Sequence, residues 1–217
     1  MNTELNSGKG QCKGTARLLI KPEQAVIELG ASQDVLIKAL NAVHHANRHG
    51  ATDDFIAVAL PQMKMGRNCM QPGHEIELIG SKASLAAYLE LEGSVSLKRR
   101  GMLVEPEVED VFMEVGKQGA AFVRDRACEK RTPGWIRRSQ ARAARRGKPV
   151  GKPVRERSND LSALALYYGE VVVHVRQVIG EVTKEPMTVS TYGFSAQGAP
   201  AVLPVMLAHL GETVDAA

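Results

Sequence analysis

The sequence predicts an α+β protein, and two observations lead to that class. The chain has 217 residues and a hydrophobic content of 44%, enough for a core in one large domain or two small ones. Segments with strand-like alternation and with helical periodicity follow in the order β-α-β-β-α-β, which is typical of a ferredoxin-like (RRM-type) unit with one open sheet face. We expect this unit at 15–116, after a flexible tail at 1–14 and before a smaller α+β half at 117–217.

The elements of the first half follow from its apolar pattern. Short apolar runs predict strands, and apolar residues spaced three and four apart predict helices. The expected strands are 16–21, 55–60, 75–79 and 110–115, and the expected helices are 33–49 and 83–91. Each helix therefore connects two strands of one sheet.

An arginine-rich helix at 133–146 is the main feature predicted in the second half. Thr132 is a suitable N-cap, Pro133 suits the first turn, and Gly147 suits the end of the helix. The remaining expected elements are strands at 120–128, 171–178 and 188–194 and a Gly/Lys/Pro linker at 147–157.

Positive charge is concentrated in one stretch of the chain. Of the 28 Lys and Arg residues, 13 lie from Arg124 to Arg157, where only Asp125, Glu129 and Glu156 oppose them, so the stretch has a net charge of +10. The rest of the chain sums to −6, against a total of +4. Such a stretch is suited to a polyanion, and the sequence therefore predicts contact with nucleic acid.

The predicted helix uses arginine and no lysine. Arginine grips a phosphate or a guanine edge with two parallel hydrogen bonds, whereas lysine is a point charge. Helical spacing places four arginines on one side, at i, i+4 and i+7 or i+8: Arg138, Arg142, Arg145 and Arg146. The alternatives are a solvated helix face, a disordered basic tail, and the basic surface of a ribosomal or DNA-binding protein.

Cysteine usage and hydropathy bear on the compartment. Cys12, Cys69 and Cys128 are odd in number and lack CxxC spacing, so we expect neither a disulfide framework nor a structural zinc site. No run approaches the ~20 apolar residues of a membrane span, and residues 1–14 lack the apolar core of a signal peptide. These observations predict a cytoplasmic protein without membrane contact.

Three of the six histidines lie in the helix predicted at 33–49. At about 100° per residue, His44 falls at the margin of the apolar stripe around Leu36, whereas His45 points to solvent. His44 is therefore the better candidate base, and a histidine that only fills a boundary position is the alternative. His45 and His49, at i and i+4, have the spacing of a metal pair, but no nearby carboxylate or cysteine completes a ligand shell.

A second candidate site lies in the sequence TYGFSAQG at 191–198. Its glycines and small residues let the backbone approach a ligand closely. The chain has four tyrosines, and Tyr192 at this turn is a candidate to position a phosphate or to stack on a base. The alternative is a hydroxyl satisfied at the edge of the core.

Together, these segments resemble the CRISPR repeat-processing endoribonucleases of type I-F (the Csy-four type), or their transposon-associated and type IV relatives. The resemblance covers about Ala16 to Pro204 and depends on the order of its motifs. These are a helix with LNAVHHAN, a strand ending in Leu60-Pro61, the segment PGHEIELIGSKASLAAYLE, a strand through Arg124-Asp125-Arg126 into the arginine helix, and a closing YGFS turn.

The resemblance implies a cut in precursor CRISPR RNA at the base of the repeat hairpin, without metal or cofactor. The ribose 2′-hydroxyl attacks the adjacent phosphate and leaves a 2′,3′-cyclic phosphate and a 5′-hydroxyl. The enzyme stays on the mature guide RNA and joins other subunits of a type I-F-like or type IV surveillance complex, which contacts target DNA in antiviral defence. The alternative is a non-catalytic cap that binds the same hairpin.

The resemblance also implies roles for single residues. His44 is the base, with His45 a rival because an ungapped count back from Pro61 selects it. Tyr192 orients the histidine or the phosphate, and Arg126 reads a guanine. Cys128 stands where the family has a glutamine beside that arginine, which implies a different repeat base or a looser contact.

Further RNA contacts are implied for arginines of the strand end and the helix: Arg124, Arg126, Arg137, Arg138, Arg142, Arg145 and Arg146. The family serine that holds the 2′-hydroxyl has no clear counterpart, because Ser162 lies too far upstream. Tyr168 is the candidate to hold the 2′-hydroxyl in its place, and a core tyrosine is the alternative.

Overall fold

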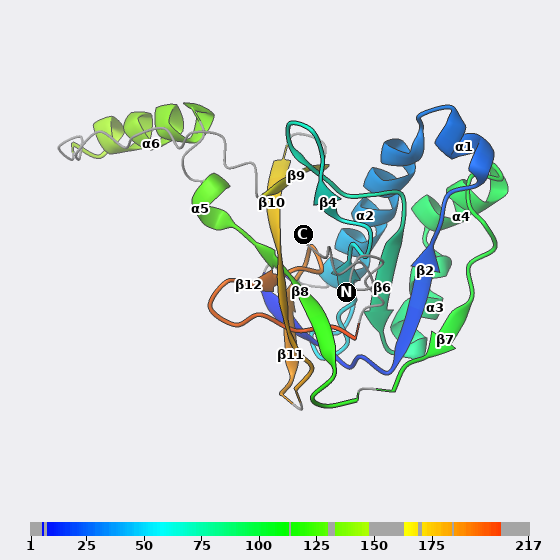
Figure 1. Cartoon of the computed structure of the whole chain (residues 1–217). Coiled ribbons are helices and arrows are strands. Elements are labelled where there is room, and N and C mark those ends of the chain that lie inside the picture. The colour runs from blue at the N-terminus through cyan, green and yellow to red at the C-terminus, as the bar shows by residue number, and fades with distance from the viewer. Residues whose placement is uncertain are drawn as a thin grey trace, which may run out of the picture.

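The computed structural model describes Asn6 and residues 8–112, 114–129, 133–147, 163–168, 171–183 and 185–204. Within these ranges the protein is a mixed α+β protein, as predicted, with two four-stranded sheets, two two-stranded sheets and six helices. Figure 1 shows one four-stranded sheet on the right, the other on the left, and the arginine-rich helix extending away from both. None of the described helices combines the length and apolar character that a membrane span requires.

The first sheet occupies the first half of the chain. Its strands are β2 (Ala16–Ile20), β3 (Ala57–Ala59), β6 (Ile76–Gly80) and β7 (Val108–Asp110), in the spatial order β3-β6-β2-β7 with antiparallel pairing throughout. Along β2, the two-residue period buries Leu18 and Ile20 and leaves Leu19 exposed. The face of β2 that carries Leu18 therefore turns to the core, and the face that carries Leu19 turns outward.

Two helices connect these strands, as predicted. They are α2 (Ser32–His49), between β2 and β3, and α3 (Lys82–Leu89), between β6 and β7. α3 begins with a capping box, in which Ser81 and Ser84 each accept a hydrogen bond from the backbone N–H of the other. Two further helices are not predicted from the periodicity: α1 (Gln24–Glu28) and α4 (Glu92–Arg99).

The last strand of this half lies before the predicted position. The alternation in the sequence predicts a strand at 110–115, but β7 ends at Asp110, and Phe112 and Val115 are exposed. β7 is stabilised by pairing with β2 and by an ion pair of 2.6 Å between Arg17 and Glu109. The prediction is wrong because backbone pairing with β2 selects the strand, and the apolar alternation does not report that pairing.

The second sheet is built by the second half. Its strands are β8 (Gln118–Arg124), β9 (Leu164–Tyr168), β10 (Val171–Glu181) and β12 (Ser195–Ala196), in the order β12-β8-β10-β9. The strand expected at 120–128 ends at Arg124, because the Asp125 carboxylate accepts from the N–H groups of Ala127 and Cys128. These bonds begin a short helix, α5 (Arg126–Glu129), where a continued strand was expected.

Part of the expected N-terminal tail belongs to the fold. β1 (Lys9–Cys12) pairs antiparallel with β11 (Met187–Ser190), and Cys12 is buried. The expectation of a tail at 1–14 is therefore wrong for residues 9–12, because a polar segment can join a sheet through its backbone alone. A small hairpin, β4 (Lys64–Met65) with β5 (Met70–Gln71), is also absent from the predicted elements.

Both halves contribute to one hydrophobic core. Leu40 and Phe55 of the first half belong to the same cluster of buried side chains as Phe122, Val173 and Phe194 of the second. This shared core brings the C-terminal part of α2 against the turn that follows β11. The candidate residues His44 and Tyr192, from different halves, therefore lie in one region.

Candidate functional site

Four side chains that the sequence singles out lie together where the two halves meet. The His44 ring of α2 stacks on the Tyr192 ring, with centroids 4.1 Å apart and planes inclined by 10°. Tyr168, at the end of β9, meets Tyr192 edge-on with centroids 4.9 Å apart. The guanidinium carbon of Arg124, at the end of β8, lies 4.8 Å from the Tyr192 centroid. These four residues are called the His44 cluster below.

The contact of His44 with the backbone assigns the proton of its ring. Nδ1 lies 3.2 Å from the backbone oxygen of Thr191. A carbonyl oxygen only accepts, so Nδ1 carries the hydrogen in this contact, and Nε2 is left as the basic nitrogen. A neutral histidine held in this tautomer can take a proton from a hydroxyl group through Nε2.

Burial lowers the pKa of His44 below its ordinary value of 6.5, because the charged form loses solvation. The hydrogen bond to Thr191 opposes this shift, whereas the positive charges of Arg48 and Arg124 add to it. The ring is therefore neutral at pH 7. Neutral histidine is the protonation state that a general base requires.

Buried Asn47 holds α2 against the chain that leads into β3. Its side-chain nitrogen donates to the backbone oxygen of Ile56 at 2.9 Å, and its side-chain oxygen accepts from the N–H of Ile56 at 2.8 Å. Since Asn47 lies one turn after His44, these bonds hold the part of α2 that carries His44. Asn47 is a site residue that the sequence identifies only as part of LNAVHHAN, because no periodicity indicates its partner.

A tight turn presents Tyr192 to His44. The N–H of Gly193 donates to the oxygen of Ser190 at 2.8 Å, and the N–H of Ser190 donates to the oxygen of Phe194 at 2.8 Å. Gly193 has φ of +80°, and a Cβ there would lie 2.5 Å from a Val58 side-chain carbon. Only glycine suits both demands. The sequence predicts that the backbone at this turn approaches a ligand closely. In the structure, the backbone at Gly193 approaches β3 of the protein closely.

The Tyr168 hydroxyl is buried in the cluster without a hydrogen-bond partner among the described residues. The Tyr168 ring centroid lies 6.5 Å from that of His44. Burial raises the pKa of this hydroxyl far above its ordinary value, so it remains protonated and able to donate. A buried hydroxyl without a partner costs about 1–3 kcal/mol.

Asp125 fixes the chain between Arg124 and Arg126. Burial alone would raise the pKa of its carboxyl, but hydrogen bonds from Arg176, at 2.6 Å, and from Cys128 lower it far below its ordinary range. The buried Cys128 thiol lies 3.2 Å from the carboxylate, whereas Arg126 is exposed at the start of α5. Cys128 therefore faces into the protein. Arg176 is a partner that the sequence does not reveal.

The arginine-rich helix is α6 (Pro133–Arg145), close to the predicted 133–146 (Figure 1). Gly147 follows it with φ of +60°, as expected of a helix end, and the predicted N-cap, Thr132, lies outside the described residues. Five arginines of this segment are exposed, and no carboxylate of the described residues pairs with them: Arg137, Arg138, Arg142, Arg145 and Arg146. α6 thus offers unpaired positive charge away from the core.

His45 and His49 lie apart from the His44 cluster. Both are exposed, and their rings stack on each other with centroids 4.3 Å apart. The described residues contain no group of three or more His, Cys, Asp or Glu placed around one metal ion. Of the two histidines that the sequence leaves as rivals, His44 is the one that contacts Tyr192.

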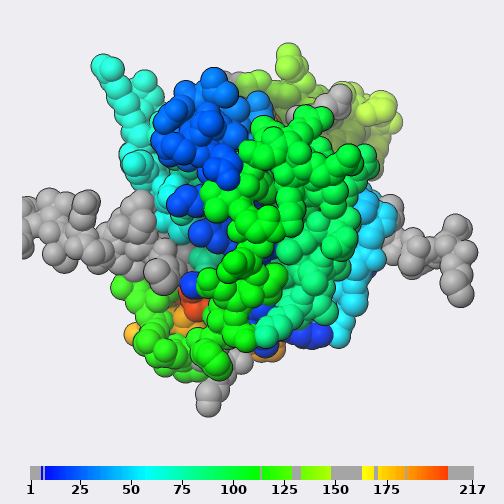
Figure 2. Space-filling model, turned by 90° about the vertical axis from the view of Figure 1, so that its right-hand side faces the viewer, coloured from blue at the N-terminus to red at the C-terminus, as the bar shows by residue number. Residues whose placement is uncertain are grey.

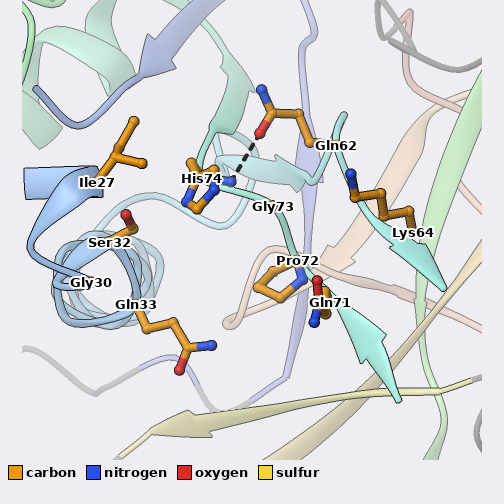
Figure 3. A pocket seen from close by; sticks show the side chains of 10 residues that line it. All are labelled: Ile27, Gly30, Ser32, Gln33, Gln62, Lys64, Gln71, Pro72, Gly73 and His74. Atoms are coloured by element: carbon orange, nitrogen blue, oxygen red, sulfur yellow. Dashed lines mark hydrogen bonds between the residues drawn. The ribbon is translucent and has the colours of Figure 1, made fainter. Parts of the chain in front are cut away.

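A polar cavity of about 630 Å³ lies at the other end of α2. Figure 3 shows Ser32 and Gln33 of this helix end on one side of the cavity and Gln71 and Lys64 on the other. The N–H of His74 donates to the side chain of Gln62 at 2.9 Å on one wall, and these are not among the residues that the sequence singles out. The cavity contains no member of the His44 cluster, so it is a separate feature.

No family model matches the chain, and no curated protein matches it. Function is therefore inferred from three features: the His44 cluster, the exposed arginines of α6, and the resemblance carried by the order of the sequence motifs. The cluster contains a histidine, two tyrosines and an arginine, and α6 adds exposed positive charge.

Proposed function

We propose that this protein is a metal-independent endoribonuclease that binds the repeat stem-loop of precursor CRISPR RNA and cuts it at the base of the hairpin. One observation carries the proposal: His44 stacks on Tyr192 beside Arg124, so a base, a tyrosine and a cation come together from three separate segments. The sequence resemblance implies a catalytic role for the first two and an RNA contact for the third. The reaction class is the one that the resemblance implies, and this set of groups supports it.

In this mechanism the RNA supplies the nucleophile. Nε2 of His44 takes the proton of the ribose 2′-hydroxyl while that oxygen bonds to the adjacent phosphorus. The bond from phosphorus to the 5′-oxygen of the next nucleotide breaks, and this oxygen takes a proton from water. The products are a 2′,3′-cyclic phosphate and a 5′-hydroxyl. The Arg124 guanidinium, beside the stack, can stabilise the negative charge that develops on the phosphorane.

The fold supports the proposal for the first half. The sheet order β3-β6-β2-β7, with α2 between β2 and β3 and α3 between β6 and β7, agrees with a ferredoxin-like assignment of residues 15–116. In this assignment α2 is the helix that carries the base.

The exposed helix α6 supports the RNA-binding part of the proposal. Arg138, Arg142 and Arg145 lie within about 60° of one another around the helix axis, so one side of α6 can follow phosphates in the groove of an RNA stem. Arg126, exposed at the start of α5, is the proposed reader of a guanine edge. The protein then stays on the hairpin in a cytoplasmic type I-F-like or type IV surveillance complex.

The direct test uses purified protein in EDTA with a labelled repeat hairpin from the neighbouring CRISPR array. The same hairpin with a 2′-deoxy sugar at the cut nucleotide is the matched substrate. Cleavage of the ribose substrate alone, with a cyclic phosphate on the product, is the expected result. Cleavage of the deoxy substrate, or a requirement for metal, would contradict the mechanism.

A second candidate is a non-catalytic cap that binds the same hairpin. The observation that favours it is the burial of Tyr168, which is only 7% exposed. Its buried hydroxyl is the one group that we assign to hold the 2′-hydroxyl of the RNA. Tight binding of the ribose hairpin without a cut, under conditions where the protein is folded, would select this candidate.

The pH profile of cleavage is expected to report the lowered pKa of His44. As pH rises, kcat/KM should increase tenfold per unit, because the neutral ring is the active form, and then level off. The midpoint should lie below 6.5, since burial lowers this pKa in the free protein. Single-turnover rates at subsaturating protein measure it, and a midpoint above 6.5 would mean that another group is the base.

Replacing Tyr168 with phenylalanine separates its catalytic and structural roles. The free energy of unfolding should stay the same or rise by up to about 1 kcal/mol, because the lost hydroxyl had no partner. Cleavage of bound RNA should slow by about tenfold or more, because the hydroxyl positions the 2′-oxygen. Chemical denaturation and single-turnover kinetics measure the two effects, with Tyr167→Phe at the exposed neighbour as control. Lower stability with an unchanged rate would make Tyr168 a core residue only.

A further inference from the structure

An acidic groove runs along the outer face of the first sheet. Its volume is about 370 Å³, and its lining comes from β2, from residues 61–62 after β3, from around the start of β6 and from the segment that leads from α4 to β7. In Figure 2, dark blue residues of β2 are visible beside the green atoms of this segment. The groove contains no residue of the His44 cluster or of α6, so neither part of the proposed function uses it.

Carboxylates outnumber cations in this groove. Five glutamates line it: Glu75, Glu77, Glu105, Glu107 and Glu109. Its two cations are already paired, Arg17 with Glu109 at 2.6 Å and Lys21 with Glu75 at 3.6 Å. Glu105 is paired with Lys98, which does not line the groove. Glu107 is exposed and has no ion pair within the described ranges. The groove is therefore negative and has carboxylate oxygens to spare.

Glu77 is the buried member of this set, with 4% of its surface exposed. Its Oε1 accepts no hydrogen bond from the described residues, and the Nη1 atom of Arg17 lies 3.9 Å away. Burial raises the pKa of Glu77 to about 7, with Arg17 opposing the shift and Glu109 adding to it. A buried carboxyl group without a donor is costly, and a donor that enters the groove would remove that cost.

The lining indicates which ligand fits. A negative surface repels phosphate groups, so RNA is excluded. The carboxylates are spread along the groove, and the described residues form no cluster that could hold a metal ion. Leu19 and Val104, which are 42% and 39% exposed, add an apolar strip. Long basic side chains match both features, because their stems pack on apolar surface while their charged ends reach carboxylates.

We propose that this groove docks a basic segment of a protein partner, with an arginine stem packed on Leu19 and Val104 and its guanidinium between Glu77 and Glu107. Charge complementarity selects the partner, and the hydrogen bonds to Glu77 fix the register of the segment. Because the groove is separate from α6, the protein can hold RNA and this partner at the same time. The inference goes beyond the proposed function and does not depend on it.

The test uses a short fluorescent peptide with arginine at every second position, and a matched peptide in which citrulline replaces each arginine. Fluorescence anisotropy with the full chain, free of RNA, should show binding of the arginine peptide and at least about tenfold weaker binding of the neutral one. The Glu107→Lys variant should bind the arginine peptide more weakly than the unchanged protein by a similar factor. Glu90→Lys, an exposed glutamate outside the groove, makes the same charge change and should have a much smaller effect.

Four outcomes would overturn the proposal. Equal binding of both peptides would show that charge does not select the ligand. Equal loss in Glu107→Lys and Glu90→Lys would show that the peptide does not occupy the groove. Sedimentation could show that the protein self-associates and that both Glu107→Lys and Arg138→Ala abolish this association. That result would show that α6 of a second copy fills the groove. The affinity of Glu107→Lys for the RNA hairpin should equal that of the unchanged protein. An affinity about tenfold or more higher would mean that RNA lies in the groove.

Discussion

Replacing His44 with alanine is expected to lower the rate of RNA cleavage by about 10²–10⁴-fold, the usual contribution of a general base. The affinity for the hairpin should stay nearly unchanged, because the ring is neutral at pH 7 and holds no phosphate charge. Single-turnover cleavage of a labelled hairpin and a filter-binding isotherm measure the two quantities on the same preparation.

The adjacent histidine is the matched control for this variant. His45 lies on the same helix, but its ring stacks on His49 and not on Tyr192. His45→Ala should therefore cleave at close to the unchanged rate. A large loss of rate in His45→Ala with full activity in His44→Ala would reverse the assignment of the base.

The double replacement Arg138→Ala with Arg142→Ala is expected to weaken hairpin binding by about a hundredfold, because each charge-assisted contact with phosphate contributes about 1.5 kcal/mol. The slope of log affinity against log salt should become flatter by about 2, since two phosphates are no longer neutralised. Cleavage of RNA that is bound at saturating protein should stay nearly the same, because α6 carries no member of the His44 cluster. Binding isotherms over a range of salt concentrations measure both effects.

A control with the same loss of charge is available on another helix. Arg99 and Arg100 are exposed at the end of α4, and their double replacement with alanine also removes two positive charges. If binding depends on α6, this control should change the affinity and the salt slope far less. Similar losses in both double variants would mean that net charge alone attracts the RNA.

Much of the fold was predictable because its longer elements bury one periodic face. The apolar stripe of α2 and the alternation of β2 match their predicted positions closely. The elements that were missed or misplaced, such as β1 and β7, are short and held mainly by backbone pairing with strands distant in the sequence. An apolar pattern cannot report such pairing, because the hydrogen-bonding groups of the backbone are the same in every residue.

The candidate site was predictable in its residue types but not in its geometry. Helical phase placed His44 at the edge of the buried face of α2, and the closing turn marked Tyr192 as unusual. The contact of His44 with Thr191 and the ion pair of Asp125 with Arg176 join segments far apart in the chain, and Asn47 is anchored on Ile56 across the end of α2. Only the contact of His44 with Thr191 joins the two halves, and it needs their shared core to form.

The sequence by itself determined the α+β class, the arginine-rich helix with its charge, and the short set of residues that can carry the chemistry. Local periodicity and charge are properties of neighbouring residues, and they need no knowledge of distant partners. Only the tertiary structure decided that His44 and not His45 meets Tyr192, that Nε2 is the free nitrogen, and that Cys128 faces inward. The contacts of His44 depend on packing between segments more than a hundred residues apart. The orientation of Cys128 depends on the buried carboxylate of Asp125. Both are set only when the core is packed.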